Sequence, residues 1–439
     1  MRTLVGSASR SIVFAAAIAG AASSGCGGAS SSDPPDAASA SVDATPADAP
    51  PGQTAPHPFG THGGYVKPGV IFPNDHTPQE LDDATASFYD AWKAKYLVPG
   101  CTAGEYRVKS TPATDAYTVS EAHGYGMLIA VIMDGHDPDA RAIFDGLFRY
   151  YDAHRSATDA GLMAWAQDQG CADVMGADSA TDGDLDIAYA LLLADREWGS
   201  SGAIDYRAAA ARIMDAILAS EIHPSGSILV GDWAGAGDAH YTGTRSSDFM
   251  IAHFRTFGIA TGESRWFDVE EHAYALVASL QATYAPKTGL LPDFAINATG
   301  VAPAPAPADW LEGADDGRYA YNACRVPWRI ATDYLMWGDV RARNAVRPIE
   351  KWLRAKTGDT PTLIRDGYGL DGMTYGHTPE LAFVAPIAVA AMIEPATGTN
   401  QPWLNALWDE LAARPTGEYY GDTLKLLAMI VISGNWWMP

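Results

Sequence analysis

The chain has 439 residues, of which 47% are hydrophobic and 10% aromatic, so it can bury a large core as one big domain or two ordinary ones. Its formal net charge of −24 at pH 7 argues against a nucleic-acid partner and against binding to an anionic membrane surface. The same charge suits an exported protein, and it would not repel a cationic polymer.

The N-terminal segment has the pattern of an export signal. Arg2 and Arg10 precede an apolar run, residues 12–22. This run is too short for a comfortable membrane span. Gly25 stands directly before Cys26, which resembles a bacterial lipoprotein signal whose cysteine becomes the lipidated N-terminus. Residues 1–26 are therefore expected to be a signal peptide of lipoprotein type. Ser23 departs from the usual leucine, which leaves simple cleavage and release open.

A low-complexity stretch follows the signal. Residues 27–56 consist almost wholly of Ala, Ser, Asp, Pro and Gly and contain no aromatic residue, which predicts a disordered linker. Residues 57–439 are expected to form a single folded domain. The protein is expected to be exported, as an outer-membrane or cell-surface lipoprotein or in secreted form. It is expected to be a monomer that touches a membrane only through the N-terminal lipid.

Beyond residue 57 the pattern is helical, with little strand signal. Thr77 and Glu80 form a capping box around Pro78, and apolar residues then recur at helical spacing. Twelve such segments are predicted: 78–97, 120–134, 138–155, 184–198, 205–221, 246–258, 266–284, 323–337, 339–357, 379–393, 402–414 and 419–433.

The helices fall into two kinds. Segments 184–194 and 381–392 are apolar nearly all round, whereas 205–221 and 339–357 carry charged residues on one face. Helices that are apolar all round are buried, and amphipathic ones lie outside them. Alternating inner and outer helices in six hairpins predict an all-α fold, an (α/α)6 barrel, whose longer connections gather at one end as a cleft. These connections are residues 156–181, 222–245 and 285–322.

Three cysteines lie beyond the signal. Cys101 and Cys171 stand in glycine-containing, loop-like stretches and could pair in an oxidising compartment. Cys324 stands in an apolar helical context and is interpreted as a buried thiol.

Asp182, Asp184 and Asp186 alternate just before an apolar helix. A calcium loop of the EF-hand type also opens with alternating aspartates, but its required Gly and Glu positions hold Ile187 and Leu193 here. A simpler interpretation is that these carboxylates cap the helix start and favour its dipole. A buried carboxylate cluster is costly unless it is hydrogen-bonded, paired or used.

The segment Ser120-Glu121-Ala122-His123-Gly124-Tyr125-Gly126-Met127 opens another helix, with Ser120 as a candidate N-cap. Gly124 and Gly126 inside a helix each cost about 1 kcal/mol of stability relative to Ala. This cost suggests that a group packed against the helix leaves no room for side chains there, and a substrate is one candidate for that group. His123 is interpreted as a structural hydrogen-bonding residue. Because no second His or Cys stands at ligand spacing, no metal and no other cofactor is expected.

Three motifs together resemble glycoside hydrolase family 8. They are residues 120–127; residues 180–188, Ala-Thr-Asp-Gly-Asp-Leu-Asp-Ile-Ala, with Trp198 closing that helix; and residues 319–329, Tyr-Ala-Tyr-Asn-Ala-Cys-Arg-Val-Pro-Trp-Arg. The resemblance covers nearly all of the chain from residue 60 onward. It implies the (α/α)6 barrel and hydrolysis of a β-1,4-linked polysaccharide with inversion at the anomeric carbon.

The resemblance also implies catalytic roles. Glu121 matches the family's general acid, and Asp182 matches the residue that holds the sugar at the cleavage point. Many members carry Asp as the base where Asn322 stands, and Asn cannot accept a proton at neutral pH. A second branch, with chitosanases and licheninases, has Asn there and a Glu in the preceding loop as base. The stretch Asp309-Trp310-Leu311-Glu312-Gly313 resembles that arrangement, so Glu312 is the predicted base. Asp315 and Asp316 are its rivals.

A glycan cleft also needs flat apolar platforms and polar groups for hydroxyls. Any one of the aromatic candidates could instead be core, Asp248 could merely cap a helix, and Arg325 could steady the base loop from three residues beyond Asn322. The candidate substrate-binding residues are Trp165, Trp233, Asp248, Tyr321, Asn322 and Arg325, with Trp328 as a further aromatic.

The resemblance indicates the class of substrate better than it indicates the particular substrate. The branch includes enzymes for mixed-linkage β-glucan, cellulose derivatives and chitosan, and β-glucan is slightly favoured here. A non-catalytic glycan-binding surface lipoprotein is the alternative, in which Asn322 marks lost chemistry. A lyase acting on uronates would normally have a cationic cleft, and the sequence gives no indication of one.

Overall fold

The computed structural model describes residues 56–65, 67–112, 116–393 and 400–439. Pro56–Pro439 forms one compact unit by its internal contacts. The predicted signal peptide, most of the predicted linker and Cys26 lie outside the described residues, so their predictions are not addressed by the structure. No helix in the described ranges is both long and apolar enough to span a bilayer.

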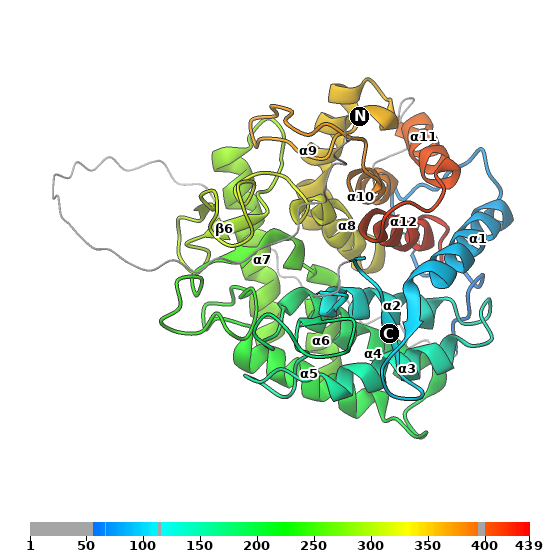
Figure 1. Ribbon diagram of the computed structural model, residues 1–439. Helices are drawn as coiled ribbons and strands as arrows, with labels where there is room; N and C mark the ends of the chain where they lie inside the picture. The colour runs from blue at the N-terminus through cyan, green and yellow to red at the C-terminus, as the bar shows by residue number, and fades with distance from the viewer. Residues whose placement is uncertain (1–55, 66, 113–115, 394–399) are drawn as a thin grey trace, which may run out of the picture. The chain divides into compact units, whose positions relative to one another are not determined.

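Helices dominate the described residues (Figure 1). The α-helices are α1 (Pro78–Tyr96), α2 (Ser120–Ile132), α3 (Ala140–Ala153), α4 (Thr181–Trp198), α5 (Tyr206–Ser220), α6 (Ile251–Thr261), α7 (Arg265–Tyr284), α8 (Val326–Trp337), α9 (Val340–Thr357), α10 (Leu381–Met392), α11 (Asn400–Ala413) and α12 (Tyr419–Ile432).

The even-numbered helices form a closed inner ring. Each packs against the next, from α2 through α4, α6, α8 and α10 to α12, and α12 packs back against α2. The odd-numbered helices lie outside this ring, each against one or two inner helices, as α5 lies against α4 and α9 against α8 (Figure 1). The predicted (α/α)6 barrel is confirmed.

Apolar periodicity explains which helices lie inside. Every residue of α10 is buried, and so is nearly every residue of α2, α4, α8 and α12. The outer helix α9 buries only one face, through Ala342, Val346, Ile349, Leu353 and a few others. A helix that is apolar all round is stable only when other helices surround it, and the inner ring provides that environment.

Local signals fix several helix ends. Thr77 and Glu80 make the predicted capping box at the start of α1. Helix α4 begins at Thr181, three residues earlier than predicted, so the aspartates lie inside the helix, and its N-cap, Ala180, makes no side-chain cap bond. Capping therefore does not explain these carboxylates. Helix α6 begins at Ile251, because the short 3-10 helix η1 (Ser246–Asp248) occupies the predicted start.

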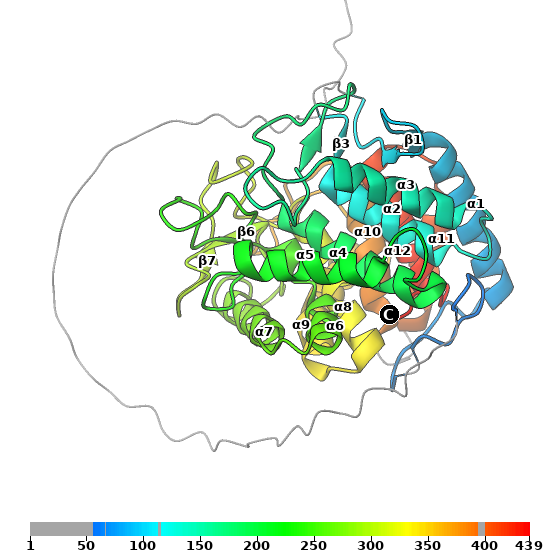
Figure 2. The same cartoon turned by 90° about the horizontal axis from the view of Figure 1, so that it is seen from below.

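The connections that lead into the inner helices lie at one end of the barrel and carry the short strands. The strands are β1 (Leu97–Pro99), β2 (Tyr106–Val108), β3 (Thr118–Val119), β4 (Ala166–Gln167), β5 (Thr244–Arg245), β6 (Phe294–Ile296) and β7 (Ala304–Pro305). They pair antiparallel as β1–β2, β3–β4 and β5–β6–β7. Figure 2 shows β6 and β7 beyond one end of α4 and α5.

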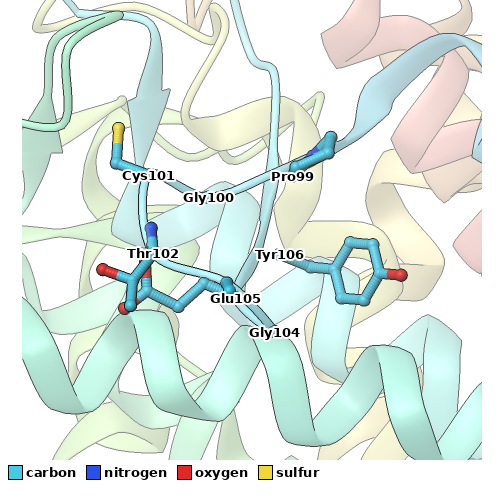
Figure 3. Close-up of a pocket in the computed structure, with 8 residues that line it drawn as sticks. Pro99, Gly100, Cys101, Thr102, Gly104, Glu105 and Tyr106 are labelled. Atoms are coloured by element: carbon cyan, nitrogen blue, oxygen red, sulfur yellow. Dashed lines mark hydrogen bonds between the residues drawn. The ribbon is translucent and has the colours of Figure 1, made fainter.

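A disulfide joins two of these connections. Cys101, between β1 and β2, is bonded to Cys171, in the segment between α3 and α4, with their Cα atoms 6.2 Å apart. The suggested pairing is confirmed, and Cys324 is a free and buried thiol as predicted. A hollow of about 300 Å³ opens over the same β1–β2 turn (Figure 3). Residues 99–106 alone line it, and none of the candidate site residues does.

Glycines let α2 and α4 approach closely. A Cβ on Gly124 would lie 2.6 Å from the Cβ of Asp186, and a Cβ on Gly183 would lie 2.6 Å from the Cβ of Ser120. A Cβ on Gly126 would meet Val108 in the same way. The suggestion that a substrate needs these glycines is therefore wrong, because the neighbours are parts of the protein itself. Ser120 packs against α4 rather than capping α2.

Candidate active site

The polar site residues come from the starts of three inner helices and from the loop before α8. Glu121 is the second residue of α2, and Asp182 is the second residue of α4. Arg325 ends the short 3-10 helix η2 (Ala323–Arg325), which leads directly into α8. Glu312 lies in the long connection between α7 and α8. Segments nearly 200 residues apart in sequence therefore contribute to one site, because the inner helices all begin at the same end of the barrel.

Arg325 is the centre of this arrangement. Its Nη1 donates to Glu121 Oε2 at 2.5 Å, to Asp182 Oδ2 at 3.0 Å and to the Tyr125 hydroxyl at 3.2 Å. Its Nη2 donates to Asn322 Oδ1 at 2.7 Å. The guanidinium is buried, so these charge-assisted bonds are made away from bulk water. One cation thus joins the predicted acid, the predicted sugar-holding carboxylate and Asn322.

A second arginine contacts Asp182. Arg245 Nη1 lies 2.7 Å from Asp182 Oδ2, and both side chains are buried. Burial alone would raise the pKa of Asp182, but the Arg245 and Arg325 guanidiniums outweigh it and hold that pKa well below its usual range. Asp182 is therefore a fixed carboxylate anion at neutral pH.

Glu121 has the opposite electrostatic setting. Burial raises the pKa of Glu121 to about 7, while Arg325 lowers it and the Asp182 carboxylate raises it. A carboxyl group with this pKa still carries its proton over much of the neutral range. Two carboxyl groups that share one arginine thus differ in protonation, which is the pattern expected of acid and anion roles in one site.

Glu312 is joined to the same network through Asn322. Because arginine can only donate, Asn322 must turn its carbonyl oxygen to Arg325, and its amide nitrogen then faces Glu312. Asn322 Nδ2 donates to Glu312 Oε2 at 2.8 Å. Burial raises the pKa of Glu312, opposed by Arg245 and by this hydrogen bond. The suggestion that Arg325 steadies the base loop is supported, since Arg325 reaches that loop through one amide.

The two rival acids have other partners. Asp316 is buried, and its carboxylate accepts hydrogen bonds from the backbone N–H groups of Leu311, Glu312 and Gly313 at 2.7, 3.2 and 2.9 Å. Asp315 is paired with Arg318 at 2.9 Å near the surface. Asp316 therefore shapes the loop that carries Glu312, and Asp315 faces a cation outside the network.

Asp184 and Asp186, the other two aspartates of the alternating run, are fully buried. Asp186 accepts two hydrogen bonds from Arg329, one turn beyond Arg325, and its Oδ1 lies 3.1 Å from His253 Nε2. Asp184 accepts from the Met163 backbone N–H at 2.9 Å, and burial raises the pKa of Asp184 well above its usual range. Both residues support the packing of α4 rather than cap its start.

The predicted aromatic platforms have different exposures. Tyr321 is 46% exposed, and Trp165 and Trp233 are half-buried, so all three keep surface available to a ligand. Trp165 lies beside the start of α2, since its carbonyl accepts from the Ser120 backbone N–H at 2.8 Å. Trp328 is 2% exposed inside α8 and packs against Tyr125, so it is a core residue and not a platform.

Asp248 was a candidate substrate-binding residue, but its side chain does not face the cleft. Its side chain is fully buried, accepts from Ser247 Oγ at 3.1 Å and lies 3.9 Å from Arg245. Burial raises the pKa of Asp248 to about 7. Its position beneath Arg245 explains the difference, because that arginine occupies the space between Asp248 and Asp182.

Two residues of the site were missed by the sequence reasoning. Arg245, directly before the predicted helix 246–258, was given no role in the site, and neither was Asp293. Asp293 Oδ1 accepts from the backbone N–H groups of Ala320 and Ala323, at 2.9 and 2.7 Å, and so holds the segment that carries Asn322. No local spacing links Asp293 to residues 27 and 30 positions away.

The described residues contain one group with metal-ligand spacing. Asp75 and His76, just before α1, and Asp409, in the second half of α11, have ligand atoms within 4.8 Å of one another, and His76 is hydrogen-bonded to Asp409. None of them belongs to the Arg325 network. His123 is fully buried and stacks on Tyr150, and burial lowers the pKa of His123 to about 3, which suits a structural residue.

Carboxyl groups of opposite protonation at one end of an (α/α)6 barrel fit an enzyme that hydrolyses glycosidic bonds by acid–base chemistry. The chain belongs to glycosyl hydrolases family 8, whose model matches residues 80–434, and it is therefore a glycoside hydrolase.

Characterised relatives cover most of the chain. It is 48% identical to a β-glucanase of Niallia circulans, over 87% of this chain and 91% of that protein. It is 39% identical to an endoglucanase of Bacillus sp. strain KSM-330, over 84% and 80% of the two chains. A solved apo β-1,3-1,4-glucanase from Paenibacillus sp. X4 superposes with a TM-score of 0.84 at 45% identity, covering 87% of this chain and 99% of that one.

Proposed function

We propose that the protein is an exported, endo-acting hydrolase of mixed-linkage β-glucan that cleaves β-1,4 bonds with inversion. The relatives with the β-glucanase and β-1,3-1,4-glucanase names share nearly half of their residues with this chain over most of its length, which favours β-glucan over chitosan. The observation that carries the mechanism is the Asn322 hydrogen bond, which ties Glu312 to the same arginine as Glu121.

Glu121 is the proposed general acid. Protonation of the leaving glycosidic oxygen requires a carboxylic acid that keeps its proton near neutral pH. Burial at the start of α2 raises the pKa of Glu121 to about 7, and the contact with Arg325 orients its Oε2. Activity is then expected to be lost as the pH rises through about 7, because the acid has given up its proton before reaction.

Glu312 is the proposed general base, in place of the aspartate that other members carry at position 322. The amide of Asn322 cannot take a proton, but it donates to Glu312 Oε2, and the proposed role of the Glu312 carboxylate is to take the proton of the attacking water. Asp316 is occupied by three backbone N–H groups and Asp315 by Arg318, so neither has the same freedom.

We infer inversion from the chain of contacts between the two carboxyl groups. Glu121 and Glu312 make no direct hydrogen bond and are joined only through Arg325 and Asn322 in turn. An inverting pair is about 6.5–9.5 Å apart, which leaves room for the attacking water, whereas a retaining pair is about 5–5.5 Å apart. Two intervening side chains fit the wider arrangement.

Asp182 is the proposed residue that holds the sugar at the cleavage point. Its two arginine partners keep it ionised, and a carboxylate anion is a strong acceptor for sugar hydroxyls. Hydrogen bonds to a distorted ring strengthen in the transition state, so this anion contributes to rate and not only to binding. Trp165, Trp233 and Tyr321 are the proposed platforms for neighbouring sugar rings.

The test is a product profile on lichenan, carboxymethylcellulose and chitosan, with the anomeric configuration followed by NMR. We expect oligosaccharides of inverted configuration from lichenan and little release from chitosan. Glu121→Gln and Glu312→Gln should each lower kcat by about 10²–10⁴-fold. Asp315→Asn is the matched control, because it removes a carboxylate from the same loop outside the network. Retained configuration would contradict the mechanism, and an active Glu312→Gln variant would contradict the base.

Export and lipid anchoring rest on separate observations. The Cys101–Cys171 disulfide suits an oxidising compartment outside the cytoplasm. We propose that Cys26 carries the lipid and that the enzyme otherwise acts as a monomer. Radiolabelled fatty acid should enter the full-length protein in a bacterial host and should not enter Cys26→Ser. Labelling of both proteins, or of neither, would count against the anchor.

In the alternative, a non-catalytic glycan-binding lipoprotein, Asn322 has replaced the catalytic base and no other residue takes its role. The contact between Asn322 and Glu312 argues against it, since a second carboxylate stands where the missing aspartate's function is needed. Absence of any reducing-sugar release by the unmodified protein would favour the alternative.

A further inference from the structure

The loop that carries Glu312 is contacted by a segment, residues 240–243, that has no proposed catalytic role. His240 and Gly243 lie in the connection between α5 and α6, just before β5, and both contact Trp310. Trp310 stands two residues before Glu312. A movement of Trp310 would therefore carry the proposed base with it.

The first contact is a hydrogen bond. His240 Nε2 lies 2.9 Å from the Trp310 carbonyl oxygen, which can only accept, so this ring nitrogen donates. The other ring nitrogen lies 2.8 Å from Asp238 Oδ1. The His240 and Trp310 rings also meet edge-on with their centroids 4.7 Å apart.

The second contact is steric. A Cβ on Gly243 would fall well inside contact distance of two Trp310 ring atoms, so the indole lies directly against the glycine backbone. Phe294 of β6 packs against another side of the same indole, with ring centroids 5.5 Å apart. Trp310 belongs to a small apolar cluster, with Trp233, Phe294 and their neighbours, that is separate from the main core.

The same segment reaches the other side of the site. Two residues beyond Gly243, Arg245 contacts Asp182 at 2.7 Å. Strand β5, the end of the segment from His240 to Arg245, is paired with β6. This pairing holds the segment in place. One stretch of six residues thus touches the anchor of the base loop at one end and the sugar-holding carboxylate at the other.

We propose that His240 is a positioning residue for hydrolysis, which, with Gly243, holds Trp310 and thereby fixes the place of Glu312 relative to Asp182. This inference rests on the proposed function, in which Glu312 is the base. Glu312 needs such support because it lies in a loop and not in a helix or strand, and small displacements of a reacting group reduce rates steeply.

The test compares His240→Ala and His240→Gln with His136→Ala. His136 follows α2, and its side chain contacts Asp90, Phe59 and Tyr89, far in the sequence from the loop that carries Glu312. His240→Ala is expected to lower kcat on lichenan by about 10- to 100-fold, with KM little changed. His240→Gln keeps one N–H donor and should recover part of the loss. His136→Ala should match the unmodified enzyme in kcat.

A pH profile separates positioning from general destabilisation. The groups around Glu312 are Arg245 of β5, Arg325 of η2, Asp316 of its own loop and Asp293 before β6. Burial is the largest cause of the raised pKa of Glu312, so a loosened and hydrated loop should lower that pKa. The acidic limb of kcat/KM should then move to lower pH in His240→Ala, while the basic limb, set by Glu121, stays in place.

Gly243→Ala is a second variant, whose new Cβ displaces the Trp310 indole, and it should move the same limb. A normal kcat and pH profile in His240→Ala would overturn the inference. So would an activity loss with both limbs unmoved and a lowered Tm, which would assign His240 a purely structural role. Glu312→Gln is measured in parallel: if it is fully active, the proposed base fails, whereas its inactivity beside a normal His240→Ala refutes only the positioning role.

Discussion

At the scale of single residues, the site sets two carboxyl groups to opposite protonation states with one shared cation. Glu121 and Asp182 both contact Arg325, yet only Asp182 also contacts Arg245. Burial dominates at Glu121 and raises its pKa, whereas two guanidiniums dominate at Asp182 and lower its pKa. The second arginine therefore decides which carboxyl group can act as an acid.

Replacing Arg245 should change the pH dependence of the enzyme. Burial raises the pKa of Glu121 and Arg245 is among the charges that oppose it, so Arg245→Gln should raise this pKa further. The basic limb of kcat/KM on lichenan is then expected to move to higher pH, with a lower maximum because Asp182 has lost a partner. Arg318→Gln, which removes a surface arginine paired with Asp315, is the control. A basic limb that moves to lower pH would contradict this account.

A buried glutamate outside the Arg325 network should make stability depend on pH. Glu221 is fully buried, accepts from Ser179 Oγ at 2.5 Å and has its pKa raised to about 8, mainly by burial and opposed by that bond. A raised folded-state pKa means that the folded protein binds more protons than the unfolded chain between about pH 4.5 and pH 8. The contribution is fully present below about pH 4.5 and is lost as the pH rises through about 8.

Glu221→Gln mimics the protonated side chain and should remove this dependence. We expect the fall in Tm between pH 5 and pH 8 to be smaller in the variant than in the unmodified protein, as measured by calorimetry. Glu271→Gln, at an exposed site, is the matched control. An unchanged difference in Tm would mean that Glu221 is ionised in the folded state.

The sequence identified some of these residues and not others for a physical reason. Glu121, Asp182, Asn322 and Arg325 stand in continuous motifs at the starts of inner helices, so local pattern was sufficient to find them. Arg245 and Asp293 act through loops that converge only after the barrel closes. Asp248 was misplaced because an acid at a helix start has the same pattern whether it faces solvent or lies beneath an arginine.

At the scale of the elements, close packing of α2 on α4 brings the proposed acid and the proposed sugar-holding carboxylate together. Both helices begin at the same end, and Gly183 and Gly124 remove the side chains that would separate them. Apolar periodicity predicted all twelve helices, with every end except the start of α6 within three residues, because the inner helices are mostly apolar and the outer ones each bury an apolar face. The start of α4 was predicted three residues late, because Gly183 is a poor helix former. The contact that requires glycine there is with Ser120, about 60 residues away.

Gly183→Ala should therefore destabilise the barrel although alanine is the better helix former. The new Cβ would lie 2.6 Å from the Cβ of Ser120, and overpacking of this kind costs about 1–3 kcal/mol. Urea unfolding should show the loss, and kcat should fall with it because α2 carries Glu121. Gly235→Ala is the control, since a Cβ there meets nothing within 4 Å. Equal stability of the two variants would show that α2 and α4 can separate without strain.

At the scale of the whole molecule, six hairpins bring distant connections to one end, and the fold must hold them there. Hydrophobic packing fixes the helices, but the connections into α2 and α4 are long and contain only short strands. The Cys101–Cys171 disulfide ties these two connections across a sequence separation of 70 residues. Closing a loop of this length in the unfolded chain stabilises the folded state by about 4 kcal/mol.

The double variant Cys101→Ser/Cys171→Ser should therefore be less stable and still active. Neither cysteine contacts the Arg325 network, so kcat on lichenan at 25 °C should stay close to that of the unmodified enzyme while Tm falls. A reductant should lower the Tm of the unmodified enzyme to a similar extent and have no further effect on the double variant. Loss of kcat without loss of Tm would instead mean that the disulfide orders the start of α2, where the strand pair β3–β4 joins the two connections next to Glu121.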